Sequence, residues 1–153
     1  MSKFNAVNAY RKERWCSEHG LHVAAKMIRA WIYLIHNSYI PYTCKIGSGT
    51  TFAYKGIGLI IHANAKIGDD CTIGSNVTIG GGGAGSAKDN RIEEFESIRG
   101  TAPVIGDRCY ISTGAKILGS IVIGDDVIIG ANAVVITDVP PNVVVRGGYR
   151  PRY

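Results

Sequence analysis

Isoleucine returns every six residues along two stretches of the chain, and this spacing is its dominant hydrophobic pattern. The residue four places after each of these anchors is usually small or aliphatic, and glycine often follows the anchor directly. The anchors are Ile61, Ile67, Ile73 and Ile79, then Ile105, Ile111, Ile117, Ile123, Ile129 and Val135. A six-residue period fits neither an α-helix nor a simple alternating strand. It predicts a parallel β-helix, in which three hexads form one triangular coil and the anchors fill the interior.

Two helices are predicted ahead of the repeat. Residues 5–19 form the first, which stops at Gly20, and residues 22–37 form the second, which is closed by a polar turn and Pro41. The apolar residues on one side of the second helix are Val23, Met27, Trp31, Leu34 and Ile35. Because the open end of a solenoid must be covered, we expect residues 1–40 to form a helical cap that buries this apolar side.

The repeat is interrupted twice before it ends. Nine residues instead of six separate Phe52 from Ile61, so residues 54–58 are expected to bulge from the coil. After Ile79, a glycine run and a charged segment carry no periodicity, which predicts a protruding loop over residues 81–103. Pro140-Pro141 is expected to end the last coil. The β-helix therefore spans 41–145, and residues 146–153 form a basic tail.

The composition fits one domain with an extended core. Of 153 residues, 46% are hydrophobic and 20 are glycine, which suits a corner-rich solenoid better than a disordered chain. The four cysteines form no CxxC pair, and Cys71 and Cys109 fall on inward positions where a free thiol acts as an apolar filler. We therefore expect a reducing cytoplasm without disulfides or zinc. Residues 1–20 are polar and charged, so no signal peptide is expected.

The net charge of +5 is concentrated at the two ends of the chain. Residues 1–37 hold six Lys or Arg against Glu13 and Glu18, and the tail adds three arginines. No basic stripe alternates with stacking aromatic residues, so a nucleic-acid partner is not expected. Small anionic ligands suit these clusters better, and an anionic membrane surface that contacts residues 1–37 is the alternative.

Residues 40–148 resemble the hexapeptide-repeat acyltransferase superfamily, and within it the serine acetyltransferase-like branch. The resemblance is carried by Ile73–Gly83 (IGSNVTIGGGG), Gly114–Gly119 (GAKILG) and Ile129–Pro141 (IGANAVVITDVPP). It implies a left-handed parallel β-helix and a homotrimer with active sites between subunits. It also implies acetyl transfer from acetyl-CoA to a hydroxyl or amine, with a histidine base and no metal.

Four histidines are candidates for the chemistry of a thioester, which needs a nucleophile, a base and oxyanion donors. His19 and His22 lie on the predicted cap helices, where their spacing makes only a weak metal pair. His36 ends the second helix, so a structural interaction with the helix dipole is expected. His62 follows an anchor at a place where glycine dominates, and we predict that it is the general base. The alternative is an ordinary strand histidine.

The resemblance is incomplete around His62. Typical serine acetyltransferases carry their main histidine near Tyr54-Lys55 of this chain, their orienting aspartate near Tyr39, and a second histidine in the long loop, which has none here. A branch of surface polysaccharide enzymes resembles this chain in a Tyr-x-Gly turn followed by a strand that ends in His, which favours His62. Tyr54 is the candidate for a hydroxyl contact to that ring; otherwise we expect the neighbouring subunit's loop to pack against it.

Coenzyme A is expected to contact three groups of small or basic residues. Gly80, Gly81 and Gly82 expose backbone N–H groups for the oxyanion, or else form a flexible loop root. By resemblance, the pantetheine arm passes Thr113, Gly114 and Ala131, which are equally suitable as corner residues. The nucleotide phosphates are assigned to Arg146, Arg150 and Arg152. A solvated tail is the alternative, because the usual Gly-Val-Pro-Ala-Lys ending is replaced here by Gly147–Pro151.

These observations predict an acetyl-CoA-dependent O-acetyltransferase. The acceptor is expected to be a sugar hydroxyl of a surface glycan precursor, with L-serine close behind, because cysteine-pathway members carry a larger helical domain and an isoleucine tail. A non-catalytic β-helix scaffold or regulatory subunit is the alternative of a different class, since a fold alone does not prove activity. The metal-dependent branch that includes carbonic anhydrases needs three convergent histidines, which the spacing does not offer.

Overall fold

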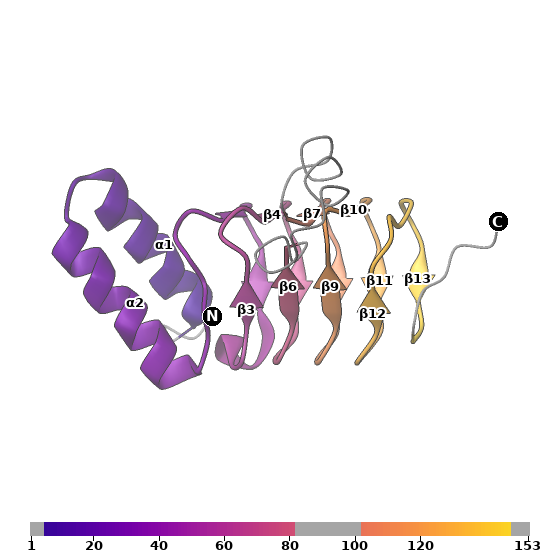
Figure 1. The fold of residues 1–153 in the computed structure, drawn as a ribbon, viewed down its shortest axis with the longest axis horizontal. Helices are drawn as coiled ribbons and strands as arrows, with labels where there is room; N and C mark the ends of the chain where they lie inside the picture. The colour runs from indigo at the N-terminus through magenta and orange to yellow at the C-terminus, as the bar shows by residue number, and fades with distance from the viewer. Residues whose placement is uncertain (1–4, 82–101, 148–153) are drawn as a thin grey trace, which may run out of the picture.

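A computed structural model describes residues 5–81 and 102–147 of the chain. Within these ranges two helices, α1 (Ala6–Glu18) and α2 (His22–His36), precede a stack of short strands. Figure 1 shows the helices at one end of the stack and β13 (Val144–Val145) at the other. The predicted helices over residues 5–19 and 22–37 are therefore confirmed to within one residue at each end.

The strands form three parallel sheets, which we call sheets I, II and III. Sheet I contains β1 (Lys45–Ile46), β4 (Lys66–Ile67), β7 (Val104–Ile105) and β10 (Val122–Ile123). Sheet II contains β2 (Thr51–Phe52), β5 (Thr72–Ile73), β8 (Tyr110–Ile111), β11 (Ile128–Ile129) and β13. Sheet III contains β3 (Ile60–Ile61), β6 (Thr78–Gly80), β9 (Lys116–Leu118) and β12 (Val134–Val135). The chain visits the three sheets in constant cyclic order, so it winds as a stack of three-sided coils.

The register between coils follows the six-residue period. Ile61 pairs with Ile79, and Ile117 pairs with Val135, in each case a residue 18 positions further along the chain. Eighteen residues are three hexads, one for each side of the coil. The prediction of three hexads per triangular coil is therefore confirmed.

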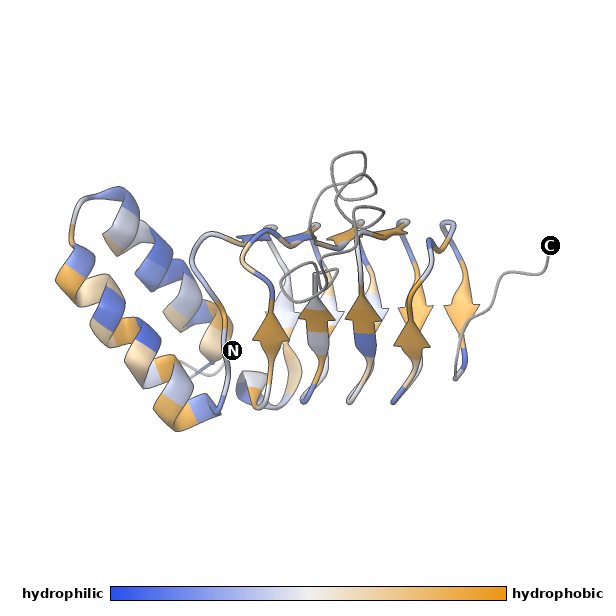
Figure 2. Cartoon of the chain, in the orientation of Figure 1, coloured by the Kyte–Doolittle hydropathy of each residue, from blue (hydrophilic) through white to orange (hydrophobic). Residues whose placement is uncertain are grey.

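The core is a column of side chains inside the coils. In each two-residue strand the second residue points inward and the first outward, because successive side chains of a strand alternate between its faces. The inward anchors are almost fully buried, and Ile73, Ile79 and Ile111 have no exposed surface. Cys71 and Cys109 are free thiols inside this column, as predicted, and each donates to a glycine carbonyl of the following coil. Figure 2 shows the resulting concentration of hydrophobic residues on the strands.

The corner between sheets I and II is held by a ladder of aspartates. Each aspartate accepts a hydrogen bond from the backbone N–H of the coil before it: Asp69 from Ser48 at 2.7 Å, Asp107 from Asp69 at 2.8 Å and Asp125 from Asp107 at 2.9 Å. The ladder satisfies corner amides that no strand partner reaches. Consecutive coils are therefore joined at this corner as well as in the sheets.

The predicted bulge is a real interruption of the first coil, between β2 and β3. Residues 53–56 form a short turn, η1 (Ala53–Gly56), and Phe52 pairs with Ile73, which lies 21 positions ahead rather than 18. The insertion is therefore absorbed at a corner and does not shift the pairing of the strands. Most of the predicted protruding loop, residues 82–101, lies outside the described residues.

The prediction that Pro140-Pro141 ends the last coil is wrong. Val139 forms a bridge with Ile123 of sheet I, and after the two prolines β13 pairs with β11. The prolines occupy the corner between these two pairings. Proline is tolerated there because a corner residue does not need to donate a ladder hydrogen bond.

Helix α1 lies against the first coil. The Tyr10 hydroxyl donates to the Cys44 carbonyl at 2.6 Å, the Asn5 amide donates to the Phe52 carbonyl at 2.9 Å, and the Arg11 guanidinium reaches the Thr50 carbonyl at 3.2 Å. The side chains of Val7 and Tyr10 are buried in the same core as the coils. These contacts support the predicted helical cap.

The apolar side predicted for α2 is exposed, so the prediction that the cap buries it is wrong. Val23 is 74% exposed and Leu34 77%, and Met27, Trp31 and Ile35 are exposed as well. Helix α2 turns Ala25 and Ile32 inward instead, and its principal partner is α1. The reason is that α1 occupies the end of the solenoid and α2 packs outside it. Neither helix is long and apolar enough to cross a membrane.

The inward and outward positions of one strand predict unequal effects of truncation. Ile73→Ala is expected to lower the free energy of unfolding by roughly 2–5 kcal/mol, because it leaves a cavity in the column. The neighbouring Thr72→Ala, on the outer face of β5, is expected to change it by about 0.5 kcal/mol or less. Urea denaturation at a fixed protein concentration measures both values, and equal losses would contradict the assignment of the faces.

Candidate active site

His62 stands at the corner that follows sheet III. Its backbone N–H donates to the carbonyl of Ile79 at 2.8 Å, so it lies beside Gly80 of the next coil. Gly80 in turn pairs with Leu118 in the coil after that. His62, Gly80 and Leu118 therefore form one column along the edge of sheet III, and the structure brings the predicted base next to the predicted oxyanion glycines.

Gly80 sits closely against the next coil. A Cβ atom added at this position would lie 3.0 Å from Cδ2 of Leu118, tighter than nearly all real contacts, so a larger residue would push Leu118 aside. Gly81 follows it at the limit of the described range, and the predicted Gly82 lies outside that range. Two of the three glycines are thus placed beside His62.

The His62 ring is partly exposed and has a defined hydrogen bond. Its Nδ1 atom accepts from the backbone N–H of Asn64 at 3.2 Å, which assigns the proton of the neutral ring to Nε2. Within residues 5–81 and 102–147, no hydrogen bond links this ring to a carboxylate. In this tautomer Nε2 offers a donor to solvent. To act as a base through Nε2, the ring must carry its proton on Nδ1 and give up the Asn64 contact.

Tyr54 lies in a strained turn on the other side of sheet III. Tyr54 and Lys55 are consecutive residues in the left-handed region, with φ of 50° and 63°. Such conformations cost on the order of 1–3 kcal/mol each and persist only where the surroundings enforce them. The side chain of Tyr54 is 72% exposed. Because Tyr54 precedes β3 and His62 follows it, the predicted contact between them is not formed within one chain.

The residues predicted for the pantetheine arm share a corner with this turn. The corner joins sheets II and III. Backbone N–H groups there donate to carbonyl oxygens of the preceding coil: Asn76 to Ile57, Gly114 to Ser75 and Asn132 to Thr113, at 2.9 to 3.0 Å. Thr113 and Ala131 are both exposed there. The structure thus groups Thr113, Gly114 and Ala131 with Tyr54, and it separates them from His62 by the width of sheet III.

Gly114 is required at its position. Its φ is 77°, a conformation that residues with a side chain rarely adopt, and a Cβ atom there would collide with the Asn132 side chain. Its conformation at the corner is therefore sufficient to explain why this residue is glycine. Of the arginines predicted to bind phosphate, Arg146 is exposed just after β13, and Arg150 and Arg152 lie outside the described residues.

The buried hydroxyl of Ser38 stabilises the strained turn that contains Tyr54. The Ser38 hydroxyl lies 2.7 Å from the Gly56 carbonyl and 2.9 Å from the His36 carbonyl, and it accepts from the Leu59 N–H at 2.9 Å. The Gly58 N–H donates to the His36 carbonyl at 2.9 Å. The turn is therefore fixed to the C-terminal end of α2. Sequence analysis missed this role of Ser38, whose only signal was its place directly after the helix.

His36 is buried under the same turn. Burial lowers the pKa of its imidazole, and the nearby positive charge of Lys55 lowers it further. The ring is therefore neutral at neutral pH, and the predicted interaction of a cation with the helix dipole is wrong. Its Nε2 atom has no hydrogen-bond partner in the described part of the chain, and its ring packs edge-on against Trp31.

Known proteins resemble both the repeat and the cap. Residues 102–137 match the family described as Bacterial transferase hexapeptide (six repeats). A serine acetyltransferase of Mycobacterium tuberculosis is 36% identical over 143 residues, which are 94% of this chain and 57% of that protein. One from Helicobacter pylori is 42% identical over 103 residues, which are 67% of this chain and 53% of that protein.

Solved structures of serine acetyltransferases also superimpose on most of this chain. Serine acetyltransferase of Neisseria gonorrhoeae superimposes with a TM-score of 0.77 at 28% identity, over 94% of this chain and 50% of that one. A serine acetyltransferase in complex with CoA superimposes with a TM-score of 0.72 at 27% identity, over 91% of this chain and 51% of that one. The chain spans about half the length of the curated relatives that it matches.

The buried His36 predicts a pH dependence of stability. Because its pKa in the folded protein lies below the unfolded value of about 6.5, the unfolded chain binds more protons, and stability is lost as the pH falls below that value. His36→Phe keeps an aromatic ring without the titration and should flatten the fall of the melting temperature between about pH 6.5 and pH 5.

The exposed Lys12 provides the matched control for Lys55. Lys55→Met should reduce the pH dependence by removing one cause of the pKa shift of His36, whereas Lys12→Met, on the exposed side of α1, should leave it unchanged. Thermal unfolding followed by circular dichroism at several pH values measures all four proteins. An undiminished pH dependence in His36→Phe would contradict the assignment.

Proposed function

We propose that this hexapeptide-repeat protein, which resembles serine acetyltransferases in sequence and in fold, transfers an acetyl group from acetyl-CoA to a hydroxyl group of a small acceptor. The observation that carries the proposal is the 36% identity to a serine acetyltransferase across 94% of this chain, including the cap as well as the coils. The left-handed sense of the β-helix is part of the same proposal, as is catalysis without a metal.

L-serine is the acceptor that we place first. The relatives at 32–42% identity are named serine acetyltransferases, and one solved neighbour is a serine acetyltransferase in complex with serine. The sugar hydroxyl that the sequence favoured stays a prediction without support from these relatives. A cytoplasmic location and a membrane contact of residues 1–37 likewise stay predictions.

We place the active site between subunits of a homotrimer. Two observations support this assembly. First, the outward residues Tyr110, Ile128 and Val144 of sheet II form an apolar column that is about half exposed in the single chain. A neighbouring copy would cover such a column. Second, His62 and the corner that contains Thr113 lie on opposite edges of sheet III in one chain. A ligand that contacts His62 and this corner at once would therefore lie between two chains, with His62 from one and the corner from the other.

His62 is proposed to act first as the general base and then as the general acid of this reaction. Its imidazole takes the proton of the acceptor hydroxyl as the oxygen bonds to the thioester carbonyl carbon. The imidazolium then returns the proton to the sulfur as the carbon–sulfur bond breaks. The reactive tautomer gives up the exposed contact to Asn64, which costs on the order of 1 kcal/mol. Because Gly80 is paired with Leu118 in the ladder of sheet III, which engages its N–H, the backbone amide of Gly81 is the proposed oxyanion donor beside His62.

A non-catalytic scaffold or regulatory role is the second candidate. The observation that favours it is the hydrogen bond of His62, whose Nδ1 is turned to the Asn64 amide instead of an orienting carboxylate. An enzyme that lost its chemistry would keep the coils and the corner geometry unchanged. The two candidates are separated by turnover, because only the first releases thiol from acetyl-CoA.

The experiment is a thiol-release assay with acetyl-CoA and either L-serine or a panel of nucleotide sugars. We expect acceptor-dependent release with L-serine, and His62→Ala should lower turnover by about 100-fold, the usual contribution of a general base. The matched control is His19→Ala, which removes an exposed histidine of the helical cap and should retain full activity.

Release with a sugar but not with serine would move the acceptor back to the glycan class. No release with any acceptor from a correctly folded protein would favour the scaffold. Full activity of His62→Ala would remove His62 from the mechanism while leaving the acetyl transfer in place.

A further inference from the structure

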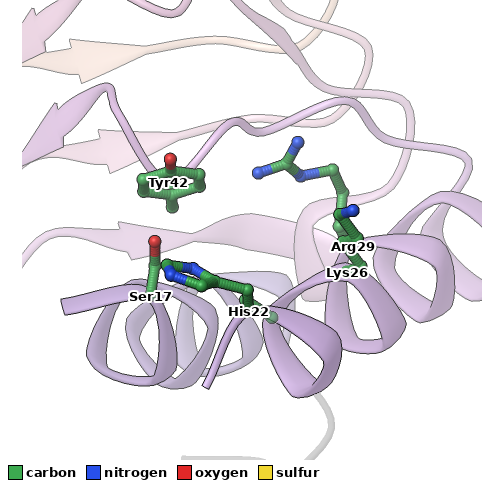
Figure 3. A pocket seen from close by; sticks show the side chains of 6 residues that line it. Ser17, His22, Lys26, Arg29 and Tyr42 are labelled. Carbon is green, nitrogen blue, oxygen red and sulfur yellow. The ribbon is translucent and has the colours of Figure 1, made fainter. Parts of the chain in front are cut away.

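A cavity lies between the two cap helices and the segment that enters the first coil. Its volume is about 370 Å³, within the range of pockets that hold small molecules. Its lining residues are Ser17, His22, Ala25, Lys26, Arg29 and Tyr42. Figure 3 shows Tyr42 facing Ser17 and His22, with Lys26 and Arg29 beside them. None of these residues belongs to the candidate active site, which is built on sheet III.

The lining of this cavity is basic and contains no acidic residue. His22, Lys26 and Arg29 project from one face of α2, because residues four and three positions apart on a helix are neighbours. Within the described ranges, the side chains of His22 and Lys26 form no ion pair or hydrogen bond. Helix α2 also begins here without a side-chain cap and without an acidic residue in its first turn. The N-terminal end of its dipole therefore adds positive potential.

Arg29 is fixed in place before any ligand arrives. Its Nε and Nη2 atoms donate to Oε1 of Glu13 at 2.8 and 2.7 Å, and Glu13 is fully buried. Its guanidinium carbon lies 5.2 Å from the centre of the Tyr42 ring, in a cation–π arrangement. These contacts use two of the five guanidinium donors, and the remaining ones stay available. A guanidinium held in this way loses little entropy when it binds an anion.

The Glu13 charge does not cancel the positive potential of the cavity. It is buried behind Arg29 and neutralises that one cation, which leaves Lys26 and the end of α2 uncompensated. The hydroxyl groups of Ser17 and Tyr42 complete the lining with neutral hydrogen-bonding atoms. The combination of cationic donors and hydroxyls suits an oxyanion better than an apolar ligand, because oxygen atoms can accept from all of these groups.

We propose that this cavity binds a small oxyanion, the phosphate or carboxylate group of a metabolite, at a site separate from the acetyl-transfer centre. Lys26 supplies the uncompensated charge, Arg29 supplies the guanidinium N–H donors that Glu13 does not use, and His22, Ser17 and Tyr42 supply further hydrogen bonds. The proposal does not depend on the acetyl-transfer activity, because it rests only on residues of the cap and of the segment around Tyr42.

The test is a titration of the whole 153-residue chain with inorganic phosphate and, in a second arm, with acetate. Ionic strength and pH are kept constant, with sodium chloride as the balancing salt. The chain has four histidines, so their Hε1 proton resonances form a simple set that single substitutions assign. We expect the His22 resonance to shift and saturate, with the resonance of His62 unmoved. The anion that saturates identifies the group as phosphate or carboxylate.

Two lysine variants make the test specific. Lys26→Ala should weaken the binding by about tenfold, because it removes one charge-assisted hydrogen bond. The matched control is Lys12→Ala, which removes an exposed lysine of α1 that does not line the cavity. It should leave the binding unchanged. Failure of both anions to give a saturable His22 shift would overturn the proposal, as would equal binding by Lys26→Ala and the wild type.

Discussion

Each inward anchor rests on the anchor of the next coil, and this contact determines where every other residue of the solenoid lies. Ile61 pairs with Ile79 and Ile79 with Ile117, so the residues that follow these anchors also fall into register. Burying one such side chain contributes about 1.5–3 kcal/mol, and a shifted register would lose that contribution in every coil at once. The corner residues take their register from these anchors and add hydrogen bonds of their own, such as those of the aspartate ladder. His62 stands beside Gly80 because the isoleucines before them are stacked.

The same constraint divides the candidate site. Residues on one corner are brought together over several coils, whereas residues on different corners are kept apart by a sheet that cannot bend. His62 and Gly80 share one corner, and Tyr54 shares another with Gly114. A rigid three-sided stack cannot close over a ligand by itself. The proposed catalytic function therefore relies on the proposed homotrimer, in which the edge of one copy would face the corner of another.

The sequence predicted the coils well because their period is written directly in the isoleucines. It also predicted the η1 bulge, since an insertion changes the spacing of anchors. It failed to predict which helix covers the end of the solenoid. The apolar side of α2, which contains Val23 and Leu34, stays exposed because α1 occupies that end. The support of the Tyr54 turn by Ser38, and the burial of His36 beneath it, join residues that no short motif connects. The tautomer of His62 depends on an amide two residues away, which a sequence motif does not reveal.

The 18-residue step also limits how such a chain can change in length. An insertion inside a strand would rotate every later anchor away from the interior, whereas extra residues at a corner leave the pairing intact. The η1 turn shows this directly, because Phe52 and Ile73 remain paired across it. New recognition surfaces are therefore expected to arise as corner additions, while lengthening of the core proceeds by whole coils. A protein of this design can acquire a new substrate without rebuilding its interior.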